Sequence, residues 1–309
     1  MSNKIKIWLM ELRAPFFTAT IVPVLLGAVI ALAHTGHIHW GYFVLTLVGG
    51  LFLHAGANVA NDYYDHLSGD DEVNTEFVRP FTGGSRVIQN KLLTPREVIT
   101  GALIFFALGS LIGIYLTITR GTGVLILGVI GIFSGFFYTA PPLNLVNRGI
   151  GELLIGLNFG ILMTLGSYYV QTKQFALEPV VASIPVALLI AAVLFINEFQ
   201  DHNADKQVGK NQWVVRLGRK KAALGYLVIF ILTYLSVVVG VVSGVVTPYA
   251  LGALLTVPLA YKALKTARTY FDDNVKLVPA NAATVMIHLF SGLLLSLGYV
   301  IETFISKYH

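Results

Sequence analysis

The chain has 309 residues, of which 55% are hydrophobic and only 12% are charged, and its mean hydropathy is +0.73. This balance excludes an ordinary soluble domain and indicates an integral membrane protein. The net charge of +5 does not indicate nucleic-acid binding, because the basic residues are spread over several loops. Cysteine is absent, so a bound metal would need oxygen or imidazole ligands.

Apolar segments of about 20 residues, the length of a membrane-crossing helix, follow one another along the chain. The first is preceded by Lys4, Lys6 and Arg13, and its length favours a retained helix over a cleaved signal peptide. We therefore expect an all-α integral membrane protein, a bundle of about nine transmembrane helices in a single domain over 1–309. The expected spans are 14–33, 41–60, 97–118, 122–139, 150–170, 179–197, 222–242, 246–263 and 283–304.

Basic residues are distributed unevenly over the predicted loops. If the N-terminus is cytoplasmic, 18 of the 21 Lys and Arg residues fall on the cytoplasmic side. Lys and Arg prefer that side in membrane proteins, where they also face anionic lipid headgroups. The distribution predicts a multi-pass protein of the cell membrane with a cytoplasmic N-terminus and a C-terminus on the opposite side.

Acidic residues gather in two of the predicted inner loops, since ten of the 16 lie in the stretches 62–97 and 198–205. Each stretch begins at the inner end of an apolar helix, where carboxylates repel one another and oppose the negative pole of the helix dipole. So dense a set of oxygen ligands needs a cation. It suits Mg²⁺, which typically binds one or two carboxylates together with phosphate oxygens.

The two acidic stretches share a helical register. Asn61 and Asp65 are four residues apart, and so are Asn197, Asp201 and Asp205. Each set lies on one helix face if the helices continue beyond the membrane. Asn61 is separated from Asn197 by 136 residues, and Asp65 is separated from Asp201 by the same number. The repeat predicts two related half-sites at one face of the bundle.

The third carboxylate of the first set breaks this register. At the position that matches Asp205 the chain has Gly69, and acidic residues follow it at Asp70 and Asp71. Either of these two carboxylates would complete the first set. The predicted metal ligands are Asn61, Asp65, Asp70, Asp71, Asn197, Asp201 and Asp205.

Basic residues follow each acidic stretch and predict a diphosphate as partner. Arg and Lys donate directional hydrogen bonds to phosphate oxygens, although the preference of basic residues for the cytoplasmic side explains the same pattern. We favour the binding interpretation most for Arg86 and Lys210. Asn58 lies within the second span and is a candidate to line the pocket. The predicted substrate-binding residues are Asn58, Asn61, Arg79, Arg86, Lys91, Arg148, Asn197, Lys206 and Lys210.

Three motifs together resemble the UbiA superfamily of membrane prenyltransferases. They are NDYYDHLSGDD from Asn61, NEFQDHNADKQVGK from Asn197 with VVRLG after it, and YTAPPL from Tyr138. The resemblance covers nearly the whole chain. It implies a bundle of nine helices that binds Mg²⁺ and a polyprenyl diphosphate and transfers the prenyl chain to an aromatic or other lipid-soluble acceptor. The residues from Gly69 to Asp71 resemble the 1,4-dihydroxy-2-naphthoate prenyltransferases of menaquinone biosynthesis.

Prenyl transfer requires stabilisation of a departing diphosphate and of an allylic cation. Metal-binding carboxylates, foremost Asp65 and Asp201, serve the first need. An aromatic face serves the second, since it attracts a cation by roughly 0.5 to 2 kcal/mol. Tyr138 lies near an inner helix end in the predicted topology, so it is the candidate for this contact, with packing of the core as the alternative role.

Two other functions fit parts of the pattern. Within the same class, the acceptor would be 4-hydroxybenzoate or a glycerol-phosphate lipid. From a different class, a cation transporter would line its pathway with the acidic residues. Transport is disfavoured because the carboxylates gather at one face and none lies in the middle of an apolar span.

Overall fold

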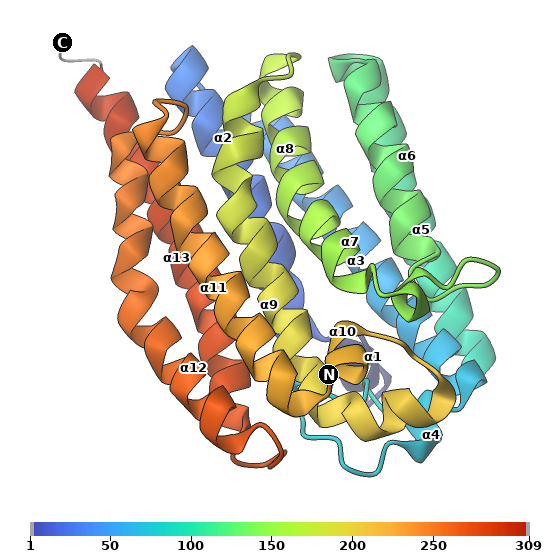
Figure 1. Cartoon of the computed structure of the whole chain (residues 1–309). Coiled ribbons are helices and arrows are strands. Elements are labelled where there is room, and N and C mark those ends of the chain that lie inside the picture. Colours follow the sequence, from blue (N-terminus) through green and yellow to red (C-terminus); the bar gives the residue numbers. More distant parts are fainter. Residues whose placement is uncertain (1–2, 307–309) are drawn as a thin grey trace.

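The computed structural model describes residues 3–306, and every element of secondary structure in that range is a helix (Figure 1). Within these described residues, seven helical segments are long and apolar enough to cross a membrane. The expected all-α, multi-pass bundle is therefore confirmed. The seven segments are Ala14–Thr35 (η1, Ala14–Phe17, and α2, Thr18–Thr35), Trp40–Ser68 (α3), Pro95–Arg120 (α5), Gly151–Thr172 (α7, Gly151–Gly156, η3, Leu157–Leu162, and α8, Met163–Thr172), Leu177–Val208 (α9), Arg219–Val242 (α11) and Val278–Ile305 within α13 (Val278–Ser306).

Two further helical segments lie where spans were predicted. α6 covers Thr122–Phe136 and is shorter than a typical span, with 15 residues. The other begins as the 3₁₀ helix η4 (Pro248–Thr256) and continues as α12 (Val257–Tyr270). Within residues 3–306, helices thus occupy all nine predicted segments, while membrane crossing by these two stays a prediction.

Short helices gather at one end of the bundle. They are α1 (Asn3–Glu11), α4 (Asp70–Val73) and α10 (Trp213–Leu217), and Figure 1 places them around the ends of α3 and α9. The end of α13 lies at the opposite end of the bundle (Figure 1). The turn η2 (Leu145–Arg148) connects α6 with α7. Polar loops and both acidic motifs therefore share the end that carries α1.

The loop before α5 ends at a capping box. The Thr94 hydroxyl accepts a hydrogen bond from the Glu97 N–H at 3.2 Å, and the Glu97 carboxylate accepts from the Thr94 N–H at 2.9 Å. Pro95 occupies the first helical position, where its missing N–H costs nothing. The start of α5 is thereby fixed, and the preceding loop, 74–94, returns over the end of the bundle.

Helices approach closely where glycine lies between them. A Cβ added at Gly27 of α2 would collide with the Thr164 carbonyl of α8, and one at Gly160 of η3 would collide with Ala187 of α9. Small residues permit such contacts in membrane bundles, where van der Waals packing drives helix association. These contacts hold η3 and α8 between α2 and α9.

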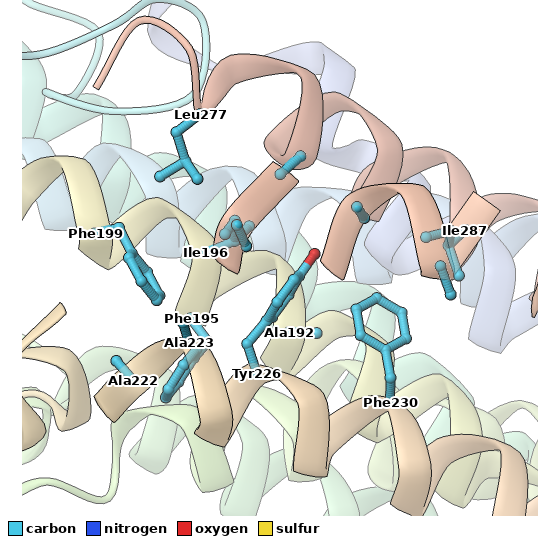
Figure 2. Close-up of a cluster of buried hydrophobic side chains, with 14 of the residues drawn as sticks. Ala192, Phe195, Ile196, Phe199, Ala222, Ala223, Tyr226, Phe230, Leu277 and Ile287 are labelled. Carbon is cyan, nitrogen blue, oxygen red and sulfur yellow. The ribbon is translucent and has the colours of Figure 1, made fainter. Parts of the chain in front are cut away.

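The largest buried cluster lies between α9, α11 and α13 (Figure 2). Phe195 and Phe199 of α9 lie on either side of Asn197 in the sequence and pack with Tyr226 and Phe230 of α11. The Tyr226 hydroxyl shares a hydrogen bond of 2.5 Å with the Thr284 hydroxyl of α13, which satisfies both polar groups in the core. This cluster fixes the part of α9 that carries the second motif.

Candidate active site

The first acidic motif lies where α3 ends. Asn61 and Asp65 belong to the last turns of α3, which stops because Gly69 adopts a left-handed conformation with φ of +77°. The chain turns directly into α4, which begins with Asp70 and Asp71, exposed by only 7% and 3%. Both candidates for the third carboxylate are therefore buried.

The second motif lies on one uninterrupted helix. Asn197, Asp201 and Asp205 all belong to α9, which continues past the apolar segment and ends at Gly209, with φ of +81°. The backbone N–H of Lys210 donates to the Asp205 carbonyl at 2.8 Å. This turn places Lys210 directly after the ladder of polar side chains.

Lys210 brings the two motifs together. Its ε-ammonium lies 2.7 Å from Oδ1 of Asp65, pairs with Oδ2 of Asp70, and lies 4.0 Å from Oδ1 of Asp205. Burial alone would lower the pKa of Lys210, but the three carboxylates outweigh burial and raise the pKa well above its usual value. Lys210 is therefore a buried, charged ammonium at the junction of two motifs that the sequence separates by 136 residues.

The first motif carries more negative charge than Lys210 neutralises. Burial, followed by the nearby Asp65 carboxylate, raises the pKa of Asp71 to about 8. Burial also raises the pKa of Asp70, although Lys210 opposes the shift. Shifts in this direction mean that burial disfavours the ionised carboxylates by more than their positive partners favour them. An additional cation at this position would stabilise their ionised forms.

The donor set fits Mg²⁺. Oδ1 of Asp70 and Oδ2 of Asp205 are buried without a hydrogen-bond partner in residues 3–306, so two hard oxygen ligands remain for a metal. Within the same residues, no three carboxylate or imidazole groups already converge as a preformed metal site. The ammonium of Lys210 lies between the carboxylates of Asp65 and Asp70. The predicted metal ligands thus remain candidates, and binding would require Lys210 to move.

Two asparagines outside both motifs support the second half-site. Asn74 donates from Nδ2 to Oδ1 of Asp201 at 2.7 Å, and Asn281 of α13 donates to Oδ1 of Asn197 at 2.8 Å. Neither residue was predicted from the sequence, because both are isolated asparagines with no characteristic spacing. Each fixes the direction of a predicted ligand, as partners of metal ligands commonly do.

Arg13 is a further residue that the sequence analysis did not place at the site. Its guanidinium pairs with Asp62, whose other carboxylate oxygen accepts the Ser85 N–H at 2.8 Å. Gly84 lies against this group with φ of +65°, and a Cβ there would lie 3.0 Å from Nη2 of Arg13 and 3.1 Å from Oδ2 of Asp71. The glycine allows the loop to approach the acidic cluster. The sequence feature that could have indicated a role for Arg13 at the site is its position directly before the first span.

Arg79 and Arg86 hold the loop that covers the first motif. Nη2 of Arg79 donates to the Ser85 carbonyl at 2.7 Å. The guanidinium of Arg86 donates to the carbonyls of Asp71 and Asn74 and lies over the Phe77 ring, 4.4 Å from its centroid. Arg86 thus contacts the backbone of the first motif at Asp71, whereas Arg79 is exposed and binds a carbonyl of the covering loop.

The remaining predicted basic residues lie further out. Lys91, Arg148 and Lys206 are all exposed, and none forms an ion pair within residues 3–306. Arg148 donates from Nε to the Leu143 carbonyl at 2.7 Å. The structure therefore does not bring these three residues to the acidic cluster, and their role in substrate binding stays a prediction.

An apolar cavity of about 450 Å³ leads from the acidic end into the bundle. Arg13, Asn61 and Tyr138 line it near that end, and Asn58 lines it one turn further along α3. Thr117 and Val124, near the turn between α5 and α6, line it at the other end. The cavity suits an amphiphile with an anionic head at the acidic cluster and an apolar tail.

Tyr138 lies in the turn after α6 and lines the cavity. A Cβ added at Gly151 would lie 3.2 Å from the Tyr138 hydroxyl, so α7 approaches the phenol closely. The Tyr138 ring therefore borders the cavity near the acidic end, and an aromatic face attracts a cation.

The helical bundle, the acidic cluster at its end and the apolar cavity are features expected of a membrane-embedded enzyme. Residues 20–298 match the UbiA prenyltransferase family, so the chain belongs to this family and is a membrane-bound prenyltransferase. The 1,4-dihydroxy-2-naphthoate octaprenyltransferase of Bacillus subtilis is 28% identical over 94% of this chain and 91% of its own length. The 2-carboxy-1,4-naphthoquinone phytyltransferase of Synechocystis is 28% identical over 95% of this chain and 93% of its own length.

A solved structure has the same fold. The UbiA homologue from Archaeoglobus fulgidus bound to DMAPP and Mg²⁺ aligns with a TM-score of 0.58 and 16% identity, covering 94% of this chain and 99% of that chain. The match of residues 20–298 to the family confirms the resemblance of the sequence motifs, and this structure shows that the fold is shared.

Proposed function

We propose that the enzyme transfers a polyprenyl group from its diphosphate to 1,4-dihydroxy-2-naphthoate in a Mg²⁺-dependent step of menaquinone biosynthesis. The observation that carries the proposal is the junction of both acidic motifs at Lys210, which pairs with Asp65 one helical turn beyond Asn61, a residue that lines the apolar cavity. The charged cluster receives the diphosphate, and the cavity receives the prenyl chain.

The residues of the acidic cluster hold the head of the substrate. Mg²⁺, when bound, neutralises the diphosphate and stabilises the negative charge that develops as this group leaves. The predicted oxygen ligands on α3, α4 and α9 would hold the metal. With a metal held by these carboxylates, the ammonium of Lys210 would be available to donate to diphosphate oxygens, and Arg79 and Arg86 of the covering loop would supply further donors.

Transfer proceeds by electrophilic substitution on the acceptor ring. The bond between prenyl C1 and the diphosphate oxygen breaks, and the diphosphate keeps the electron pair. The face of Tyr138 stabilises the allylic cation, which bonds to the ring carbon that carries the carboxylate. The carboxylate leaves as CO₂ and returns its bonding electrons to the ring, so no external oxidant or base is required.

The acceptor assignment rests on the relatives and on the first motif. Both relatives cited above are named for naphthalene derivatives, and each matches this chain over nearly its full length. The break at Gly69 is the sequence feature shared with the naphthoate branch in the resemblance described above. A 4-hydroxybenzoate or glycerol-phosphate lipid acceptor is the alternative.

The site faces the cytoplasm in our proposed topology. The acidic motifs, α1 and α10 share one end of the bundle, and most basic residues fall in loops predicted to lie there. A water-soluble diphosphate head would therefore enter from the cytoplasm, while the C-terminus lies on the opposite side.

An acceptor panel tests the proposal. Purified enzyme in lipid nanodiscs is incubated with Mg²⁺, a labelled polyprenyl diphosphate, and either carboxyl-labelled 1,4-dihydroxy-2-naphthoate, 4-hydroxybenzoate or a glycerol-phosphate lipid. We expect a prenylated naphthalenediol and one labelled CO₂ per product. Transfer to another acceptor alone would overturn the acceptor assignment, and no product with any acceptor would overturn the proposed reaction.

A further inference from the structure

A group of polar side chains lies at the cavity wall, further into the bundle than Asn58 and Asn61. His54 of α3 and Asn158 of η3 line the cavity, and Thr20 of α2 and Ser134 of α6 support them. The His54 ring contacts Phe159, with ring centroids 4.5 Å apart, so Asn158 beside it lies at the same level. We call these four polar residues, Thr20, His54, Ser134 and Asn158, the polar belt.

The two lining residues of the polar belt, His54 and Asn158, each use one polar side-chain atom in a hydrogen bond to a supporting residue. Thr20 Oγ1 and His54 Nδ1 share a hydrogen bond of 2.8 Å, and Ser134 Oγ donates to Asn158 Oδ1 at 2.9 Å. Neither His54 Nε2 nor Asn158 Nδ2 has a hydrogen-bond partner in residues 3–306. The supporting bonds therefore fix both side chains and leave their outer nitrogens for a ligand.

The backbone of η3 also favours a ligand at this level. Leu157–Leu162 forms a π-helical turn, a rare distortion that frequently marks functional sites. Asn158 and Phe159 both line the cavity from this turn, so η3 supplies a hydrogen-bonding group and an aromatic wall side by side. An aromatic ligand with polar substituents matches this pair.

The prenyl chain cannot account for the polar belt. A polyprenyl tail has no polar atoms, and polar side chains within a membrane are costly unless they have partners. His54 lies seven residues before Asn61 on α3, which corresponds to about 10 Å along the helix axis. A ligand at this level would therefore lie deeper in the bundle than the acidic cluster, with its near edge directed along α3 toward Asn61.

We propose that His54 and Asn158 position the aromatic acceptor by hydrogen bonds to its ring hydroxyl, with the ring against Phe159. This inference rests on the proposed function and specifies where that function's second substrate binds. The two residues are positioning residues, since they act on the ring edge away from the breaking bond. Structural packing of four polar residues is the competing explanation.

Kinetic constants for the two substrates separate these explanations. For His54→Leu and Asn158→Leu we expect the KM for 1,4-dihydroxy-2-naphthoate to rise about tenfold each, the effect of losing one buried hydrogen bond. The KM for the polyprenyl diphosphate should stay within about twofold, because the acidic cluster is unchanged. His54→Gln retains a donor and should recover most of the acceptor affinity.

Matched controls come from buried polar residues outside the cavity. His288 of α13 and Thr164 of α8 are exposed by only 1% and 0%, and neither lines the cavity. His288→Leu and Thr164→Val should leave the acceptor KM unchanged. If a leucine variant does not fold, Thr20→Val tests the inference instead. This substitution removes the hydrogen bond that supports His54 without altering the cavity wall, so it should raise the acceptor KM a few-fold.

Failure of this inference gives a different result from failure of the proposed function. If wild-type enzyme transfers to no aromatic acceptor, the proposed function is wrong whatever the variants do. If wild-type enzyme is active and folded His54 and Asn158 variants keep the wild-type acceptor KM, the acceptor site is elsewhere. Equal increases in the KM for both substrates would indicate a structural role and would also overturn the inference.

Discussion

The ε-ammonium of Lys210 lies 2.7 Å from Oδ1 of Asp65, although 145 positions separate the two residues in the sequence. Asp65 ends the polar ladder on α3, and Lys210 follows the ladder on α9. Their ion pair joins the two half-sites. It also gives the buried carboxylates an internal cation where Mg²⁺ and a diphosphate are expected to bind.

Replacement of Lys210 by methionine should reveal this role in stability and in activity. Loss of one partner of a buried ion pair costs about 3 to 5 kcal/mol, because the carboxylates are left without a counter-charge. We expect a lower Tm without metal, partial recovery of the Tm with Mg²⁺, and prenyl transfer at least about 100-fold slower. Thermal unfolding with and without Mg²⁺, together with steady-state kinetics, measures each effect.

Lys210→Arg is the conservative comparison, since it retains the positive charge. It should preserve most of the Tm without metal. Lys276→Met is the matched control, because Lys276 pairs with Asp273 at the surface and its side chain is 63% exposed. A methionine variant at Lys210 with wild-type Tm in the absence of metal would show that the ion pair contributes little.

Alanine at Gly84 should weaken diphosphate binding. An added Cβ would lie 3.0 Å from Nη2 of Arg13 and 3.1 Å from Oδ2 of Asp71, at a residue with φ of +65°. We expect the KM for the prenyl diphosphate to rise roughly tenfold, as the loop moves away from the acidic cluster. Steady-state kinetics at a saturating concentration of the acceptor measure this KM.

Gly244→Ala separates crowding from backbone strain. Gly244 has φ of +72°, and no atom lies within 4 Å of an added Cβ. Both variants carry a similar backbone cost of about 1 kcal/mol, but only Gly84→Ala should change substrate affinity. Similar kinetics for the two variants would argue against a contact between the Gly84 loop and the substrate site.

Asn74→Leu tests a residue that orients a predicted ligand. Asn74 donates to Oδ1 of Asp201 at 2.7 Å, and loss of such a partner typically lowers metal affinity about 10- to 100-fold. We expect the Mg²⁺ concentration for half-maximal activity to rise accordingly. Asn203→Leu removes an exposed amide that donates to Glu76 and should leave the metal dependence unchanged. An unaltered Mg²⁺ dependence in Asn74→Leu would remove Asp201 from the metal site.

The helical part of the site was predictable because helices obey a simple register. Asn197, Asp201 and Asp205 were expected on one face of a helix extending beyond the membrane, and α9 extends to Val208. The first motif was less certain, because Gly69 breaks the register. Its left-handed conformation starts α4 at once, so Asp70 and Asp71 both become buried.

The contacts made by loops were not predictable from local sequence. Asn74 reaches Asp201 across 127 positions, and its own neighbours give no periodic pattern. Arg13 pairs with Asp62 and lies against Gly84, and neither contact is indicated by the sequence around Arg13. The π-helical turn η3 also went unnoticed, since apolar periodicity does not distinguish it from an ordinary helix.

The central claim is that both acidic motifs form one Mg²⁺–diphosphate site, and calorimetric binding of a non-reactive prenyl thiolodiphosphate tests it most directly. Wild-type enzyme, Asp65→Ala, Asp201→Ala and the exposed control Asp272→Ala, whose side chain is 75% exposed, are titrated with and without Mg²⁺. We predict Mg²⁺-dependent binding in the wild type and the control, and its loss in either motif variant while helix content is preserved. Wild-type affinity in either folded motif variant, or binding independent of Mg²⁺, would contradict a shared site.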